Sequence, residues 1–188
     1  LLYGAFPDAH FVLIEPQVEF EPSLKRICDQ QDAEYHLVGV GETERSIPLY
    51  RLPDSPTGSA FLPPSKQAEK IWGEFNRSDT QMPIVKLDTY EAHEGPFLLK
   101  IDTEGFELEV LRGATDVLAK TDLVLMEVGI IERQEGEGDL IEIGMFMKKS
   151  GFRLIDIPML TQQSTSGPLL YIDVAFAKIG GSADIAIS

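Results

Sequence analysis

Residues 97–118 read FLLKIDTEGFELEVLRGATDVL. Their first part, Phe97–Asp102, is a short apolar run of the kind that forms a buried strand. From Glu104 to Leu118 the spacing of apolar residues becomes helical and places one apolar face toward a core. That face consists of Val110, Leu111, Ala114, Val117 and Leu118. The pattern therefore predicts a core strand followed directly by a covering helix.

The residues before this unit predict a strand, a helix and a second strand. The run Phe11–Ile14 has the continuous apolar character of a strand buried on both faces, and Glu15-Pro16 ends it. A helical pattern follows from Val18 to Gln30, and the next apolar run, Tyr35–Val40, is closed by Gly41. Strands that are joined through helices pair in parallel, so the chain belongs to the α/β class.

The alternation continues after residue 118. The sequence predicts a strand over Leu123–Val128, a helix over Asp139–Lys149 and a strand over Phe152–Ile157. The last apolar run, Tyr171–Ile179, follows a Ser/Gly/Pro loop with no helix between. We therefore expect it to pair antiparallel with the preceding strand.

The segment between the predicted strand that ends at Val40 and the predicted strand that begins at Phe97 is harder to interpret. A strand is expected over residues 46–52, but the prolines and glycine that follow predict an irregular surface insertion over about residues 45–85. Long loops of this kind are often lids or binding elements. Within it, Lys66–Phe75 has the pattern of a short helix whose aromatic residues pack inward.

Size and composition favour one domain without polyanionic partners. The chain has 188 residues, 43% of them hydrophobic, and we expect a single domain over residues 1–180 with a loosely held tail over 181–188.

Sixteen basic against 31 acidic residues give a net charge of −15, which opposes binding to nucleic acid or an anionic membrane. No apolar run reaches the roughly 20 residues of a membrane span. The single cysteine, Cys28, cannot form an internal disulfide, and a cytoplasmic location is expected.

Acidic residues follow several of the predicted strands. Ligands of open α/β sheets bind beyond the carboxyl ends of the strands. Glu15, Glu42, Asp102 with Glu104, and Glu127 all lie at or near such ends. An acidic residue in the position of Glu15 can accept hydrogen bonds from both ribose hydroxyls of a nucleoside cofactor. The alternative is that Glu15 ends its strand in solvent.

Asp102 and Glu104 also have a purely structural interpretation. They precede a helix, whose free N–H groups and dipole stabilise carboxylates. Together with Glu107 they offer oxygen ligands to a divalent ion, but their spacing specifies no metal loop, and we predict no metal site. His10, His36 and His93 are scattered along the chain, and we expect none of them to be catalytic.

The segment Leu99–Ala114, LKIDTEGFELEVLRGA, resembles the signature of the FkbM methyltransferase family. The resemblance extends over about residues 4–157. It includes Phe6-Pro7, Gly58-Ser59, Leu87-Asp88 and Leu125–Val128. It implies a Rossmann-like class I methyltransferase, a three-layer sandwich with a mostly parallel sheet and an antiparallel last strand. It also implies methyl transfer from S-adenosylmethionine, usually to oxygen.

The resemblance also implies roles for single residues. Glu15, with Pro16, holds the cofactor ribose, Val40 and Gly41 lie near the adenine, and Asp102 faces the methionine end. Asp102 or Glu104 is the expected base. Ser59 and Glu127 are expected to orient the acceptor, a hydroxyl of a small molecule or glycan.

The chain departs from the family pattern at its start. The family begins with a strand and a glycine-containing turn that meets the methionine part of the cofactor, and no such segment precedes Leu1. We therefore expect an N-terminally incomplete domain, whose missing strand belongs between those ending at Glu15 and at Asp102. A noncatalytic binding or scaffold domain is the main alternative. A nicotinamide-dependent oxidoreductase shares the α/β plan but does not account for the residues from Lys100 to Ala114.

Overall fold

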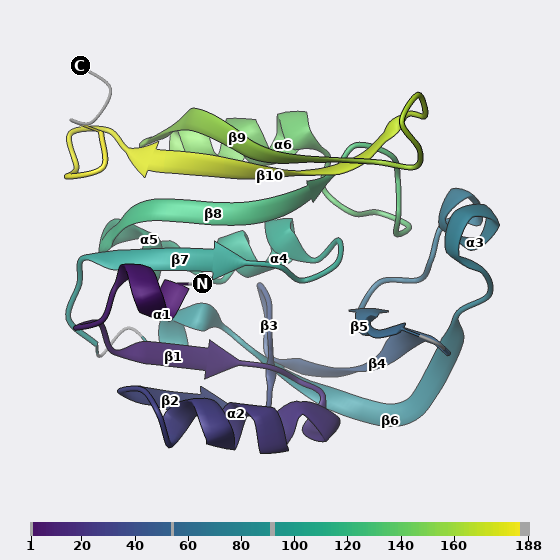
Figure 1. Ribbon diagram of the computed structural model, residues 1–188, viewed down its shortest axis with the longest axis horizontal. Coiled ribbons are helices and arrows are strands. Elements are labelled where there is room, and N and C mark those ends of the chain that lie inside the picture. The colour runs from purple at the N-terminus through teal and green to yellow at the C-terminus, as the bar shows by residue number, and fades with distance from the viewer. Residues whose placement is uncertain (1, 54, 91–92, 185–188) are drawn as a thin grey trace.

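The computed structural model describes residues 2–53, 55–90 and 93–184 (Figure 1). The strands are β1 (Phe11–Ile14), β2 (Ala33–His36), β3 (Gly39–Val40), β4 (Arg45–Leu52), β5 (Ser55–Ala60), β6 (Asn76–Val85), β7 (Phe97–Ile101), β8 (Thr121–Gly129), β9 (Phe152–Gln162) and β10 (Leu169–Lys178). The helices are α1 (Leu2–Ala5), α2 (Glu21–Cys28), α3 (Lys66–Trp72), α4 (Glu107–Arg112), α5 (Thr115–Ala119) and α6 (Leu140–Lys149), with 3-10 turns η1 (Val18–Phe20) and η2 (Leu87–Tyr90).

The carboxyl-terminal half forms a four-stranded sheet in the order β7-β8-β10-β9. β7 and β8 are parallel, and β10 is antiparallel to both of its neighbours. Phe176 of β10 stands between Val124 of β8 and Leu154 of β9. The predicted antiparallel pairing of the last strand is therefore confirmed. Its insertion between β8 and β9 was not predicted, because the sequence gives strand order along the chain and not across the sheet.

The amino-terminal strands are arranged differently from the prediction. β1 and β2 pair in parallel, and α2 packs on β2. The predicted strand over Tyr35–Val40 is divided: β2 ends at His36, and β3 pairs with β6 in another sheet. The residues of β1 are half-buried, so the prediction of burial on both faces was wrong. Among the described residues, β1 pairs with β2 alone and β7 with β8 alone.

The segment over residues 45–85 is regular, and the prediction of an irregular insertion was wrong. Its strands β4, β5 and β6 form a sheet with β3 in the order β3-β6-β4-β5, and α3 follows β5. The proline Pro56 lies in β5, an edge strand, where a missing N–H is tolerated. Leu49, Ala60 and Ile84 of these strands are buried, so the segment contributes to the core. The aromatic Trp72, predicted to pack inward, is half-buried at the end of α3.

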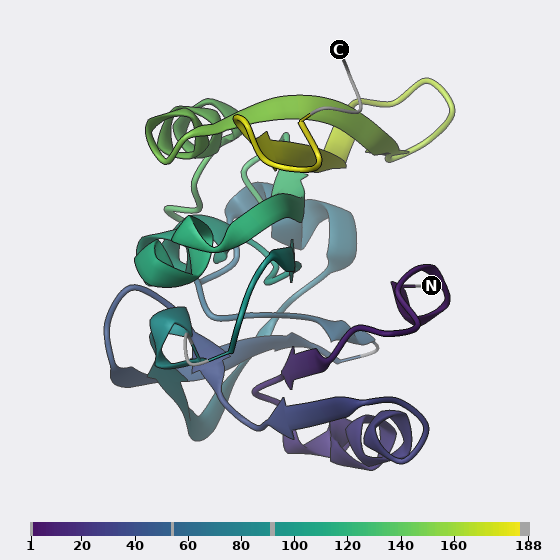
Figure 2. The same ribbon diagram turned by 90° about the vertical axis from the view of Figure 1, so that its left-hand side faces the viewer.

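Helices cover both faces of the strands, which gives the predicted three layers. In Figure 2, α4, α5 and α6 lie on one side of the strands, with α1 and α2 on the other. α4 and α5 contact β8, and α6 contacts β9. The mixed α/β class and the antiparallel last strand are thus confirmed, although the strands form three hydrogen-bonded sheets. No helix among the described residues is long and apolar enough to cross a membrane.

The predicted tail is partly anchored. Asp184 pairs with Arg153 at 2.5 Å and accepts a hydrogen bond from the backbone N–H of Gly180 at 2.9 Å. The side chain of Ser182 donates to Asp122. Residues 185–188 lie outside the described residues.

The helix predicted over Glu104–Leu118 is two short helices separated at Gly113. A Cβ on Gly113 would lie 2.0 Å from the backbone oxygen of Gly41, so only glycine permits this close approach. Asp88 then starts α5, because its carboxylate accepts hydrogen bonds from the backbone N–H groups of Asp116 and Val117. The five residues predicted to face the core are all buried.

Substitution of Gly113 tests this close approach. Gly113→Ala should lower the free energy of unfolding by about 2 kcal/mol or more, because the added methyl meets backbone that cannot move away. Gly144→Ala is the matched control, since Gly144 lies in α6 with nothing within 4 Å of its added Cβ. It should leave stability unchanged or raise it by about 0.5–1 kcal/mol. Equal stability of the two variants in urea unfolding would contradict the packing.

Candidate functional site

A cavity of about 90 Å³ lies where the carboxyl ends of three strands meet. The residues that follow β1, those around β3 and those that follow β7 all line it. The lining comprises Ile14, Glu15, Pro16, Gln17, Val38, Gly39, Val40, Leu49, Thr57, Ser59, Phe61, Asp102, Thr103 and Glu104. Segments about 90 residues apart in sequence therefore form one site, in the place that an open α/β fold favours for ligands.

Two acceptor groups lie side by side on the β1 wall of this cavity. Oε1 of Glu15 accepts a hydrogen bond from the backbone N–H of Gln17 at 2.8 Å. Burial raises the pKa of Glu15 above its ordinary value, while hydrogen bonds from Gln17 oppose the shift. Gln17 is only 5% exposed, and its side-chain oxygen has no hydrogen-bond partner. A buried acceptor without a partner is costly, so a ligand with hydroxyl or amine donors fits this wall.

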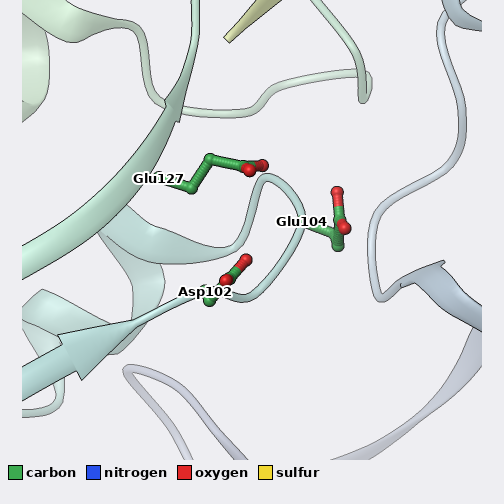
Figure 3. Close-up of side chains that lie close together, drawn as sticks. All are labelled: Asp102, Glu104 and Glu127. Atoms are coloured by element: carbon green, nitrogen blue, oxygen red, sulfur yellow. The ribbon is translucent and has the colours of Figure 1, made fainter. Parts of the chain in front are cut away.

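Three carboxylates lie close together (Figure 3), and two of them, Asp102 and Glu104, line the cavity. Asp102 follows β7, Glu104 lies on the next turn, and Glu127 projects from β8. Their side-chain oxygens lie within 4.8 Å of one another. Burial raises the pKa of Glu104 to about 7, and neighbouring carboxylates add to the shift. Burial also raises the pKa of Glu127. The raised pKa suits Glu104 to exchange a proton near neutral pH.

Arg133 contacts two of these three carboxylates, Glu104 and Glu127. Its guanidinium Nη1 lies 2.5 Å from Glu127 and 3.2 Å from Glu104, and its side chain is only 4% exposed. Glu137 accepts a hydrogen bond from the backbone N–H of Arg133 and lies 3.7 Å from its Nε. The guanidinium supplies the positive charge that this acidic pocket needs. It also opposes the rise in the pKa values of Glu104 and Glu127.

The segment over residues 62–65 fixes the loop that carries Arg133. The backbone N–H of Ser65 donates to the carbonyl of Arg133 at 2.9 Å, and the hydroxyl of Ser65 donates to the carbonyl of Glu132 at 2.5 Å. Pro64 and Gln134 form an antiparallel bridge. The residues between β5 and α3 thus contact the loop that carries Arg133.

The turn that carries Glu104 is built around a buried carboxylate. Oε1 of Glu107 accepts hydrogen bonds from both the backbone N–H and the hydroxyl of Thr103, and from the N–H of Gly105. Glu104 has a φ of 52°, a left-handed conformation that is rare outside glycine. Such conformations persist where surrounding contacts hold them, often at functional sites.

These contacts correct two predictions for the acidic residues. Neither Asp102 nor Glu104 caps α4, because its N-cap is Phe106 and no side chain caps it. Glu107, grouped with them as a possible ion ligand, is 2% exposed and points to the Thr103–Gly105 turn. The third member of the cluster is Glu127, one of the acidic residues predicted near the ends of strands.

The structure brings most of the predicted site residues together. Glu15, Pro16, Val40, Ser59, Asp102 and Glu104 line the cavity. Gly41 does not line it: a Cβ on Gly41 would lie 2.9 Å from the ring of Phe106, so packing alone accounts for glycine there. Glu127 joins the acidic cluster instead of the lining.

Gln17 and Arg133 were missed. Gln17 stands two residues after Glu15, and nothing in its type signals a buried amide. Arg133 lies in a polar loop, and its burial depends on the segment over residues 62–65, which is distant in sequence.

Comparisons with known proteins agree with this architecture. The model of the methyltransferase FkbM domain family matches residues 6–154. The structure resembles that of methyltransferase FkbM from Methylobacillus flagellatus KT, with a TM-score of 0.53 and 16% identity. The likeness covers 92% of this chain and 39% of that one, so the chain spans about two fifths of that protein's length.

A second structure is more distant. It is the 1,6-didemethyltoxoflavin-N1-methyltransferase of Burkholderia thailandensis with bound 1,6-didemethyltoxoflavin and S-adenosylhomocysteine. Its TM-score is 0.41 at 14% identity, over 94% of this chain and 74% of that one, and at that level the likeness carries no conclusion. No protein of curated function matches the chain significantly. The family match covers most of the sequence, and the chain therefore belongs to the methyltransferase FkbM domain family.

Proposed function

We propose that the protein transfers a methyl group from S-adenosylmethionine to a hydroxyl of a small molecule or glycan. The observation that carries this proposal is the cavity itself, which Glu15 and Gln17 line together with Asp102 and Glu104. Membership of a methyltransferase family supports the reaction class. A cytoplasmic location stays a prediction.

The residues of the cavity fit the nucleoside part of the cofactor. Its ribose offers two hydroxyl donors, and the Glu15 carboxylate, which already accepts a hydrogen bond from the backbone N–H of Gln17, is the proposed acceptor for them. The unpartnered oxygen of Gln17 offers a further acceptor. A volume of about 90 Å³ suits one part of a ligand, since pockets for whole drug-sized molecules are about 300–1,000 Å³. Val38, Gly39 and Val40 supply the apolar wall for the base.

The acidic pocket supplies proton chemistry. S-adenosylmethionine, when bound, provides an electrophilic methyl group on a sulfonium. The chain's own residues then have to align the acceptor and take its hydroxyl proton. Glu104 is the proposed base, because a carboxylate with a pKa of about 7 is suited to accept a proton at neutral pH. Asp102 alongside it is the alternative base. Glu127 and Ser59 are proposed to orient the hydroxyl.

Calorimetric titration with S-adenosylhomocysteine tests the cofactor part of the proposal. Glu15→Gln should weaken binding about 10- to 100-fold, because it replaces a charged acceptor of hydrogen bonds by a neutral amide. Glu42→Gln is the matched control, since Glu42 also follows a strand end but does not line the cavity. It should bind like the unmodified protein. If the folded protein fails to bind at all, the noncatalytic alternative is favoured. Equal affinity of the Glu15→Gln and control variants would remove Glu15 from the site.

The raised pKa of Glu104 predicts a pH-dependent stability. A carboxyl group whose pKa is raised in the folded state favours folding when protonated, and this contribution is lost as the pH rises toward and through 7. Glu104→Gln stays neutral at every pH. Its free energy of unfolding relative to the unmodified protein should therefore increase by roughly 1–3 kcal/mol between pH 5 and pH 8. A difference that stays constant over this range in urea unfolding would contradict the assignment.

A further inference from the structure

Exposed apolar side chains gather on α6 and β9. Among the described residues, ten large apolar side chains are exposed, and six of them belong to these two elements. The six are Ile141, Met145, Leu154, Ile157, Met159 and Leu160. Both elements lie at the opposite end of the molecule from α2 (Figure 1). A concentration of exposed apolar residues on one part of a surface marks an interaction site.

The helix α6 has an apolar stripe on the side that it turns away from the sheet. Ile143 and Met147 are fully buried, and α6 packs on β9. Ile141 and Met145 are four residues apart, so their side chains are neighbours on the helix surface. They are 68% and 69% exposed. The pair Ile141 and Met145 is called the apolar stripe below.

Two residues of β9 extend this apolar surface. Leu154 stands directly opposite Phe176 of β10. Leu160 stands directly opposite Ile172. Opposite residues of antiparallel strands point to the same face of a sheet, and Phe176 and Ile172 belong to the core in which α6 buries its inner side. Leu154 and Leu160 therefore point to the side of the sheet on which α6 packs, where they are 47% and 60% exposed.

The edge of β9 itself is poorly suited to pairing with another strand. β9 is the last strand of its sheet, but Pro158 within it has no N–H to donate. The pairing of β9 with β10 is also irregular between Asp173 and Ala175. Prolines and irregularities of this kind prevent edge-to-edge association of sheets. A partner is therefore expected on the side chains of α6 and not on the edge of β9.

The charges around α6 identify a second copy of the chain as the partner. The whole chain has 31 acidic and 16 basic residues, but residues 139–153 hold only two acidic residues against three basic ones. These are Asp139, Glu142, Lys148, Lys149 and Arg153. Repulsion between two copies of this acidic protein is therefore weakest at this face.

The flank of the apolar stripe is complementary to itself. Glu142 and Lys149 are exposed and seven residues apart, which places them on the same flank of α6. When two identical helices pack antiparallel about a two-fold axis, each flank meets the same flank of the other copy. Glu142 of each copy then faces Lys149 of the other.

We propose that the protein forms a two-fold symmetric dimer in which the apolar stripes of two α6 helices pack antiparallel, flanked by ion pairs between Glu142 and Lys149. Leu154 and Leu160 enlarge the contact toward the roughly 800 Å² per partner of a standard stable interface. None of these residues lines the cavity of the proposed function. The dimer therefore does not depend on that function.

Analytical ultracentrifugation at chain concentrations up to about 200 µM tests the dimer. The mass should rise from that of one chain toward that of two. Met145→Glu should raise the dissociation constant at least about tenfold, because the dimer buries the new carboxylate among apolar side chains. Val18→Glu is the matched control, since Val18 is 60% exposed in η1, outside this face, and it should associate like the unmodified protein. A monomer at every concentration, or equal dissociation constants for the two variants, would overturn the proposal.

Reversal of the flanking charges tests the antiparallel arrangement. Lys149→Glu brings like charges together and should weaken association about fivefold or more. Addition of Glu142→Lys restores opposite charges and should return the dissociation constant to within about twofold of the original. The Tm of each variant is measured alongside, because Glu142 also accepts a hydrogen bond from the backbone N–H of Asp139 at the start of α6. A folded double variant that associates no better than Lys149→Glu would contradict the arrangement.

Discussion

The burial of Arg133 among three carboxylates is the interaction on which the candidate site depends. Glu104, Glu127 and Glu137 could not be buried together without a compensating charge, because desolvation of each carboxylate is expensive. The guanidinium meets all three, and its side chain is 4% exposed. Removal of one partner from such a buried group costs about 3–5 kcal/mol in other proteins. The acidic pocket and the loop after β8 are therefore one structural unit.

This unit explains why the segment over residues 45–85 matters. Ser65 and Pro64 hold the backbone on either side of Arg133, and the same segment contributes Thr57 and Ser59 to the cavity wall. The segment over residues 45–85 thus holds the loop that carries Arg133, and it also forms part of the cavity wall. Glu107 holds the turn on which Glu104 adopts its left-handed conformation, through hydrogen bonds from Thr103 and Gly105. Arg133, Ser65 and Glu107 therefore position the site although they do not line the cavity.

The elements that the sequence predicted well are those with local signals. The continuous apolar run of β7 and the helical spacing after Glu104 identified the core, and α6 begins directly after Asp139, which caps it, close to the predicted start. The break at Gly113 was missed because it depends on contact with Gly41, which is distant in sequence. The strands over residues 55–85 were missed because Pro56 weakens a local strand signal, although an edge strand tolerates it. Glu15 and Asp102 were found as strand-end acids, whereas Gln17 was missed because its residue type carries no signal, and Arg133 because its burial depends on a segment that is distant in sequence.

The most direct test of the proposed function is a crystal structure of the protein with S-adenosylhomocysteine. The account predicts that the nucleoside occupies the cavity between Glu15 and Val40, with its ribose hydroxyls within hydrogen-bond distance of the Glu15 carboxylate and its sulfur on the side of Asp102. Binding elsewhere would contradict it. Binding in the open depression beside α3, which is lined by Lys66, Lys70 and Glu132 and has a volume of about 780 Å³, would be one such result.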